Sequence, residues 1–216
     1  MPESDPVRRL CAAVTAVPDQ DPSSDENAAD RRAASGGPSH ERLVDVVRHA
    51  CLAAGLDRSF LQEFGPPGDR AEPETLLLVL PAGANEARVV RDITHRLDDA
   101  ATGAASSPAG APRLVIAFDQ GLTRLTGNGF EGTVVTAVHR MCTDARARTA
   151  LTVHAGPGVA VVLSAALLDD LAPPGPGGRD LSAFAPLTVE LPDRLIAAWL
   201  HAPGRRFEIP ARPSEK

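Results

Sequence analysis

The chain has 216 residues, enough for one domain with a full hydrophobic core, and its formal charge of -6 is opposite in sign to a nucleic-acid-binding surface. Aromatic residues make up only 3% of the chain and tyrosine is absent, which argues against a base-stacking platform. Three widely spaced cysteines, an acidic N-terminus and the lack of a membrane-length apolar window predict a soluble, cytoplasmic protein with reduced thiols and neither nucleic-acid nor membrane partners.

The first part of the chain predicts a strand, a loop, a helix and a hairpin. Residues 7–17 contain the apolar run LCAAVTAV and predict a first strand. Residues 18–39 have almost no bulky apolar side chain, so they cannot offset their ordering entropy and predict a disordered internal loop. Ser39 is a candidate N-cap for a helix that ends near Gly55. The segments 59–64 and 75–80 then predict a hairpin whose second strand is buried.

The rest of the chain alternates between strands and helices. The expected helices are 85–101, 132–145 and a short one from Ser164 to Leu171, and the expected strands are 113–118, 159–163, 186–191 and 195–200. The last two strands are joined by Pro192 and Asp193 and predict a closing hairpin. We therefore expect an α/β sandwich of the α+β kind, with a mixed, mainly antiparallel sheet and helices packed on it. A single domain is predicted over 7–205, with tails at 1–6 and 206–216.

The most informative stretch is GNGFEGTVVTAVHRM, which allows two interpretations. Gly127, Gly129 and Gly132 match the G-x-G-x-x-G fingerprint of dinucleotide-binding proteins. That fingerprint requires the glycines to follow a strand directly, and here DQGLTRLT lies between Phe118 and Gly127. A flexible turn is the alternative that this spacing favours over a dinucleotide cradle.

From Gly132 onward, GTVVTAVHRM resembles the G-x-x-V-N-x-A-x-R-[LM] segment of class III nucleotidyl cyclases. Upstream, RLVIAFDQG is similar to the family's R-L-x-V-A-L-H-x-G strand, with Asp119 at the histidine position. PETLLLVLP and VAVVLSAALLDDL parallel a hairpin strand and a strand–helix unit of the same family. The resemblance spans roughly residues 60–200 and is greatest to divergent actinobacterial cyclase-like domains. It implies the ferredoxin-like cyclase homology fold.

The resemblance also implies a site. Family members hold two metal ions, Mg or Mn, on two aspartates, orient the ribose with an asparagine and stabilise phosphate charge with an arginine. The arginine corresponds to Arg140, and the asparagine corresponds to Thr136. The second metal-binding aspartate corresponds to Glu74 or to Asp69, and the purine-selecting aspartate falls at Gly129.

Several of these positions lack the residue that the reaction needs. The expected first strand carries no acid for a metal, and Lys216 is the only lysine, so no lysine within the domain can select a purine. A nucleotide, if bound, is expected near Gly129, Gly132 and Arg140. We expect a catalytically degenerate nucleotidyl cyclase-like domain that acts as a regulatory or dimerisation module, as a homodimer or with a related chain. Any purine nucleotide that it binds is expected to bind weakly.

Two other functions stay open at this point. The chain is alternatively an active class III cyclase completed by a partner chain, or a Rossmann-type dinucleotide-binding oxidoreductase. Single residues also have purely structural interpretations. Arg140 is equally well a solvated helix residue, and Glu74 a charge at the start of a strand. His139 and His154 lack partners at metal-ligand spacing, and Cys142 is expected in the core.

Overall fold

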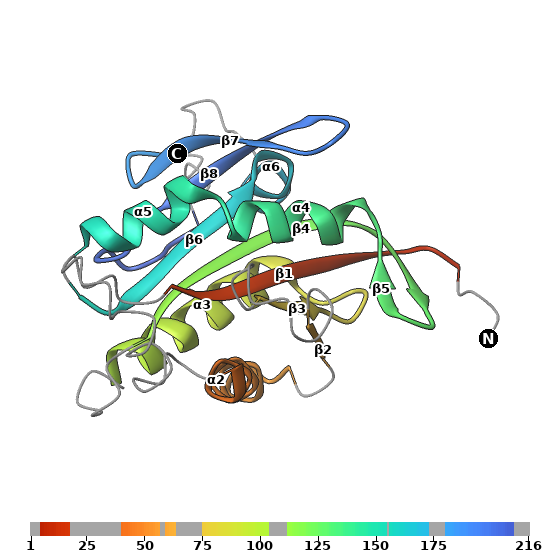
Figure 1. Cartoon of the computed structure of the whole chain (residues 1–216), viewed down its shortest axis with the longest axis horizontal. Coiled ribbons are helices and arrows are strands. Elements are labelled where there is room, and N and C mark those ends of the chain that lie inside the picture. The colour runs from red at the N-terminus through yellow and green to blue at the C-terminus, as the bar shows by residue number, and fades with distance from the viewer. Residues whose placement is uncertain are drawn as a thin grey trace, which may run out of the picture.

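The computed structural model describes residues 5–17, 40–56, 59–63, 75–103, 112–154, 156–172 and 180–209. They form one twisted sheet with helices on both faces (Figure 1). In chain order the elements are β1 (Val7–Val17), α2 (His40–Ala53), β2 (Phe60–Glu63), β3 (Thr75–Val79), α3 (Glu86–Gly103), β4 (Arg113–Thr126), β5 (Gly129–Glu131), α4 (Thr133–Cys142), α5 (Ala145–Val153), β6 (Gly158–Ser164), α6 (Ala165–Leu171), β7 (Phe184–Glu190) and β8 (Leu195–His201).

The sheet is mixed and mainly antiparallel, as predicted. Its order is β2-β3-β1-β4-β6-β8-β7, with β5 paired to β4 outside this path. Among the described strands β4 and β6 are the parallel pair, and the other pairs are antiparallel. The hairpins β2–β3 and β7–β8 close its two ends. A Rossmann fold needs a run of parallel crossovers, so the alternative of a Rossmann-type oxidoreductase is wrong.

Strand β1 lies at the centre of the sheet and is buried on both faces. It pairs with β3 on one side and with β4 along its whole length on the other. Leu10, Ala12 and Val14 point to one face, and Cys11 and Ala13 to the other, and none is more than 2% exposed. This double burial is the reason why the strand reads as a continuous apolar run rather than as an alternating pattern.

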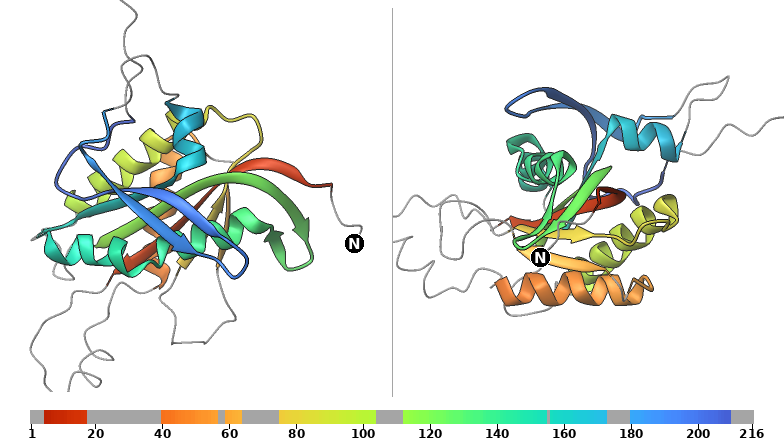
Figure 2. Two further views of the ribbon diagram at one scale, coloured as in Figure 1. Left: turned by 90° about the horizontal axis from the view of Figure 1, so that it is seen from above. Right: turned by 90° about the vertical axis from the view of Figure 1, so that its right-hand side faces the viewer.

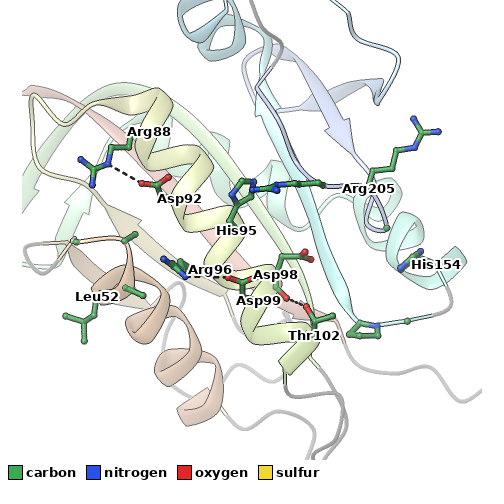
Figure 3. Close-up of a pocket in the computed structure, with 17 residues that line it drawn as sticks. Leu52, Arg88, Asp92, His95, Arg96, Asp98, Asp99, Thr102, His154 and Arg205 are labelled. Carbon is green, nitrogen blue, oxygen red and sulfur yellow. Dashed lines mark hydrogen bonds and ion pairs between the residues drawn. The ribbon is translucent and has the colours of Figure 1, made fainter.

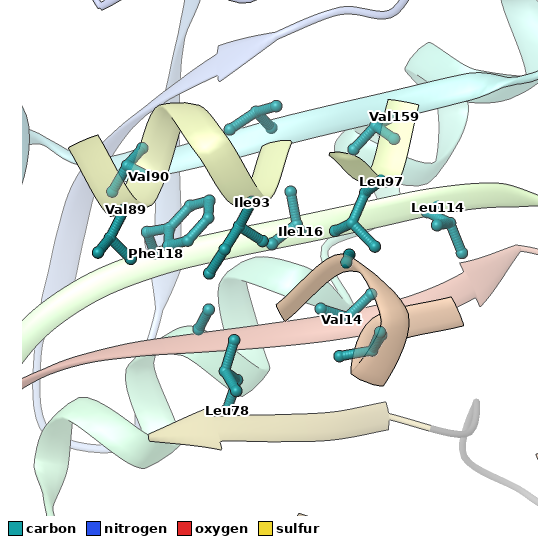
Figure 4. Close-up of a cluster of buried hydrophobic side chains, with 14 of the residues drawn as sticks. Val14, Leu78, Val89, Val90, Ile93, Leu97, Leu114, Ile116, Phe118 and Val159 are labelled. Carbon is teal, nitrogen blue, oxygen red and sulfur yellow. The ribbon is translucent and has the colours of Figure 1, made fainter. Parts of the chain in front are cut away.

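Two hydrophobic clusters cover the two faces. Helices α2, α3 and α6 pack on one face, and α4 and α5 on the other (Figure 2). On the α3 face, Val90, Ile93 and Leu97 lie against the strand residues Ile116 and Phe118 (Figure 4). On the other face, residues of α4 and α5 pack on β1, β4 and β6.

Four elements differ from the sequence expectation: β4 is longer than expected, α4 is shorter, and β5 and α5 are not among the expected elements. The strand expected to end at residue 118 continues to Thr126, because β1 pairs with it from Arg113 to Thr123 and the remainder pairs with β5. The helix expected over 132–145 ends earlier, at Cys142, and a separate helix, α5, begins at Ala145. There Asp144 accepts a 2.8 Å hydrogen bond from the backbone N–H of Arg146 and starts α5 as its N-cap. The loop 18–39 lies outside the described residues.

The fingerprint glycines have local structural roles. Gly127 lies in the turn between β4 and β5, and no atom lies within 4 Å of the place its Cβ would take. Gly132 is the N-cap of α4 with φ +150°, and a Cβ there would overlap the carbonyl oxygen of Leu122. Gly121 on β4 lies outside the fingerprint and lets α4 approach β4 closely, since a Cβ at Gly121 would lie 3.0 Å from Cβ of Val134.

The glycines therefore predict two opposite mutational outcomes. Gly132→Ala should lower the free energy of unfolding by about 2–4 kcal/mol, because it strains the backbone and drives Cβ into a carbonyl oxygen. Gly127→Ala, within the same fingerprint, should change it by less than about 0.5 kcal/mol. Urea denaturation of both variants measures the difference. Equal costs at the two glycines would contradict this assignment of their roles.

Candidate functional site

Helix α4 presents the two positions implied by the cyclase resemblance on its exposed face. Thr136 and Arg140 lie four residues apart, one helical turn, and both are exposed. The opposite face of α4 is buried in the core and consists of Val134, Val135, Ala137, Val138, Met141 and Cys142. The arginine and the threonine hydroxyl are therefore accessible to a ligand or partner that approaches from outside the subunit.

The end of α4 nearest the glycines is held by backbone contacts. Gly132 provides no side-chain cap, and its carbonyl accepts hydrogen bonds from the backbone N–H groups of Val135 and Thr136. Gly132 therefore fixes where α4 begins and how closely it approaches β4. Its assignment as a nucleotide-binding residue stays a prediction.

Gly129 faces a side chain that the sequence did not single out. The carboxamide of Gln62, on β2, occupies the space that a Cβ at Gly129 would take. The Gln62 Oε1 accepts a 2.7 Å hydrogen bond from the backbone N–H of Phe130. Gly129 has φ +107°, a conformation that other residues rarely adopt. The position implied for purine selection is thus filled by the chain itself.

Arg9 holds the same hairpin from β1. Its guanidinium lies 5.2 Å from the ring centroid of Phe130 and donates a 2.9 Å hydrogen bond to Oγ1 of Thr123. Thr123 in turn donates to the carbonyl of Val7. Together, Gln62, Phe130, Arg9 and Thr123 form a clamp that fixes β5 against β1 and β2. We call these four residues the β5 clamp. The sequence gives one sign of this clamp: Gln62 is a polar residue that follows two apolar residues in the strand FLQE.

Asp119, at the family's histidine position, is engaged inside the fold. Its Oδ1 accepts a 2.5 Å hydrogen bond from Oγ of Ser164 and a 2.9 Å bond from the backbone N–H of Gln120. Burial raises the pKa of Asp119, although these hydrogen bonds act in the opposite direction. Ser164 also accepts from the N–H of Leu167 and caps α6. Asp119 thereby connects β4 to the start of α6.

The described residues do not fit the two-metal site of a cyclase. β1 contributes no acid along its length, and Glu74 and Asp69 lie outside the described residues. Within the part of the chain that the structure describes, no three His, Cys, Asp or Glu side chains are grouped so that they could hold a metal ion. The metal assignment of Glu74 and Asp69 therefore stays a prediction.

The remaining candidates have structural surroundings. Cys142 is fully buried, and its Sγ donates a 3.3 Å hydrogen bond to the carbonyl of Val115, in keeping with a core residue. His154 lines a crevice of about 1090 Å³ that runs along α3 from Arg88 to Thr102 and past the C-terminal end of α2 (Figure 3). Opposite charges in this crevice are paired along α3, as in the 3.2 Å contact of Arg88 with Asp92. None of its lining residues comes from α4 or β5.

No protein-family model and no curated protein matches the chain. Among solved structures, an adenylate/guanylate cyclase/hydrolase from Silicibacter pomeroyi is similar to it, with 18% identity and a TM-score of 0.46 over 92% of this chain and 99% of that one. The catalytic core of a rhodopsin-guanylyl cyclase with converted specificity, in complex with ATPalphaS, is similar with 12% identity and a TM-score of 0.48 over 94% and 99%. None of the described helices is long and apolar enough to cross a membrane.

The contact between Gly129 and Gln62 can be measured by a double-mutant cycle. Gly129→Ala should destabilise the protein by about 1–3 kcal/mol, through backbone strain and displacement of the Gln62 carboxamide. Gln62→Ala alone should cost about 1 kcal/mol, because it removes the acceptor of the Phe130 N–H. In the Gln62→Ala background, Gly129→Ala should cost about 0.5–1.5 kcal/mol less than in the natural chain. Additive costs in denaturant titrations would show that the two residues do not touch.

Proposed function

We propose that the chain is a catalytically degenerate nucleotidyl cyclase-like domain that acts as a regulatory or dimerisation module. The observation that carries the proposal is β1, a strand without any acid that is buried on both faces. In the family that the motif resembles, this strand supplies a metal-binding aspartate. A carboxylate added to the interior of this β1 would be buried without a partner, at a cost of several kcal/mol.

The remaining chemistry on α4 supports the same conclusion. Thr136 offers a hydroxyl where the ribose-orienting amide is expected, and a hydroxyl is shorter and has a single donor. Arg140 retains a cation that suits a phosphate. One arginine provides attraction for an anion, but it does not supply a base or a metal for attack by a ribose hydroxyl. Weak nucleotide binding without turnover is the activity that this set of residues supports.

The β5 clamp supports a loss of purine recognition. Gln62 fills the space beside Gly129, and its Oε1 is already bonded to the Phe130 N–H. A base entering at this position would have to displace that side chain and leave a backbone N–H without its acceptor. Any nucleotide bound near Arg140 would therefore be held mainly by its phosphates and would need Mg or Mn only as a counterion.

Dimerisation would give the domain a role that requires no catalytic turnover. Helix α4 keeps Thr136 and Arg140 on an accessible surface, and the core that positions this helix is intact. The family resemblance implies pairing through such surfaces, in a homodimer or with a related chain. Arg140 would then act at an interface, by contacting an acidic group or a phosphate of the partner.

One observation favours the alternative of a cyclase completed by a partner. Arg140 is exposed, and it is the family's transition-state arginine by resemblance. A partner that supplies the missing metal-binding aspartate would let Arg140 act on a metal-bound triphosphate. This alternative requires turnover only in the presence of the partner.

Activity and binding assays separate these possibilities. With Mn²⁺ and ATP or GTP, the isolated protein should form cyclic nucleotide no faster than a control reaction without protein. Calorimetric titration should show at most weak binding that is lost in Arg140→Ala, because this variant removes the cation that holds the phosphates. Arg48→Ala, a variant at an exposed arginine on α2, on the other face of the sheet, is the matched control.

Metal-dependent cyclic nucleotide formation by the isolated protein would overturn the proposal of degeneracy. Formation only after mixing with a related chain would establish the partner-completed alternative. Light scattering of the purified protein tests dimerisation separately, and a strictly monomeric mass would remove the homodimer.

A further inference from the structure

Three aromatic rings meet on the α3 face of the sheet, at its β7–β8 end. Phe184 of β7 and His201 of β8 have ring centroids 5.3 Å apart, and Phe207, beyond β8, lies 5.4 Å from His201 and 6.3 Å from Phe184. All three pairs meet edge to face, the geometry that aromatic rings prefer. His201 and Phe207 are 2% and 4% exposed.

His201 has no hydrogen-bond partner in this cluster. Both Nδ1 and Nε2 are buried, and neither is bonded to any of the described residues. Buried polar atoms without a partner are uncommon and point to strain or to a function. Burial, and to a smaller extent the nearby charge of Arg205, lowers the pKa of His201. The ring is therefore held neutral in the folded protein.

The surroundings offer little that could stabilise a proton on this ring. The neighbouring strands present Val161 of β6 and Phe184 of β7. On α6, which packs against β8, the acids Asp169 and Asp170 are exposed, and Asp170 is bonded to Arg8 and Gln120. The charged side chain of the C-terminal segment that acts on the ring is Arg205, a cation.

Helix α3 contributes a second histidine, but one with a different role. His95 is bonded through Nε2 to the carbonyl of Phe207 at 2.8 Å. A carbonyl only accepts, so Nε2 donates, and it can do so in the neutral and in the protonated ring. Acidification therefore preserves the His95 contact, whereas a proton on His201 would place a charge among aromatic rings.

The segment held by these contacts is residues 202–209, which follow β8 without helix or strand. Its anchors are Pro203, which is buried beside Gly158 of β6, the buried ring of Phe207, the His95 bond to the Phe207 carbonyl, and Ile209, which packs at the edge of the α3-face cluster. A segment with few anchors opens at a lower free energy than the sheet it covers. Loss of the Phe207 contact would therefore release it without unfolding the domain.

We propose that His201 is the proton-sensitive latch of this segment: when its ring binds a proton, Phe207 leaves the cluster and residues 202–209 detach from the α3 face. With the latch closed the ring is neutral, and with it open the ring is solvated and titrates as an ordinary histidine near 6.5. The closed form thus keeps its full stability above pH ~6.5. Below this pH the open fraction rises up to about tenfold per pH unit, until the lower pKa of the closed form is reached.

The single tryptophan provides a reporter. Trp199 lies two residues before His201 on the same face of β8. It is partly buried and packs against the hydrophobic cluster of the α3 face. Between pH 7.5 and 5 its emission should shift to longer wavelength, while circular dichroism of the domain stays unchanged. Hydrogen exchange of the 202–209 peptide, corrected for intrinsic pH dependence, should speed up by about tenfold or more, and the core strands should keep their protection.

Variants locate the titrating group. His201→Phe keeps an aromatic ring and should abolish both pH responses, so that the latch stays closed at pH 5. Phe207→Ala should leave the segment exchanging fast at every pH. His95→Gln, which keeps a donor to the Phe207 carbonyl, and His49→Gln, at an exposed site on α2, should both retain the pH response.

If His201→Phe does not fold, an NMR titration of the histidine rings in the natural chain decides the question. A ring assigned to His201 should titrate at a lower pH than an ordinary histidine, in step with the exchange of residues 202–209. The proposal is overturned if the segment remains protected at pH 5 in a folded protein. It is equally overturned if the His201→Phe variant shows the same response as the natural chain.

Discussion

Strand β1 is buried on both faces of the sheet, and this burial limits which side chains its interior positions accept. Because β1 lies between β3 and β4 and beneath helices on both faces, every side chain from Leu10 to Val14 must be apolar and compact. The alanines at positions 12 and 13 allow the layers on both faces to approach. The same requirement explains the chemistry that the strand lacks, since a carboxylate in this interior would need either a metal or a buried cation beside it.

The placement of α4 follows from that sheet through close contacts rather than through polar bonds. Gly121 brings the start of the helix to within contact distance of β4, and Gly132 leaves room for the Leu122 carbonyl. Once these contacts are made, the helical period decides which side chains are buried, and Thr136 and Arg140 are left on the outside. Packing alone is therefore sufficient to expose the two positions implied by the cyclase resemblance.

The sequence allowed most of the fold to be predicted, because the strands and helices follow hydrophobic periodicity and end at glycines, prolines or capping residues. The length of β4 was underestimated, since residues beyond Phe118 are held by pairing with β1 and β5, which local pattern does not reveal. The β5 clamp was also missed. Gln62 and Phe130 are far apart in the chain, and only the tertiary fold brings the carboxamide to Gly129. Likewise, nothing in the segment around Phe207 indicates that its ring is inserted in the core.

The resemblance of GTVVTAVHRM to the cyclase segment rests mainly on residues that the fold requires. Gly132 is fixed by its backbone conformation and by the Leu122 carbonyl, while Val135, Val138 and Met141 are buried against the sheet. Substitution at any of them would disturb the core, whether or not the protein catalyses a reaction. Thr136 is exposed and free of that constraint, and by this resemblance it stands where the cyclase segment has its asparagine. A resemblance carried by packed residues is therefore informative about architecture, whereas activity must be judged from the exposed positions and from β1.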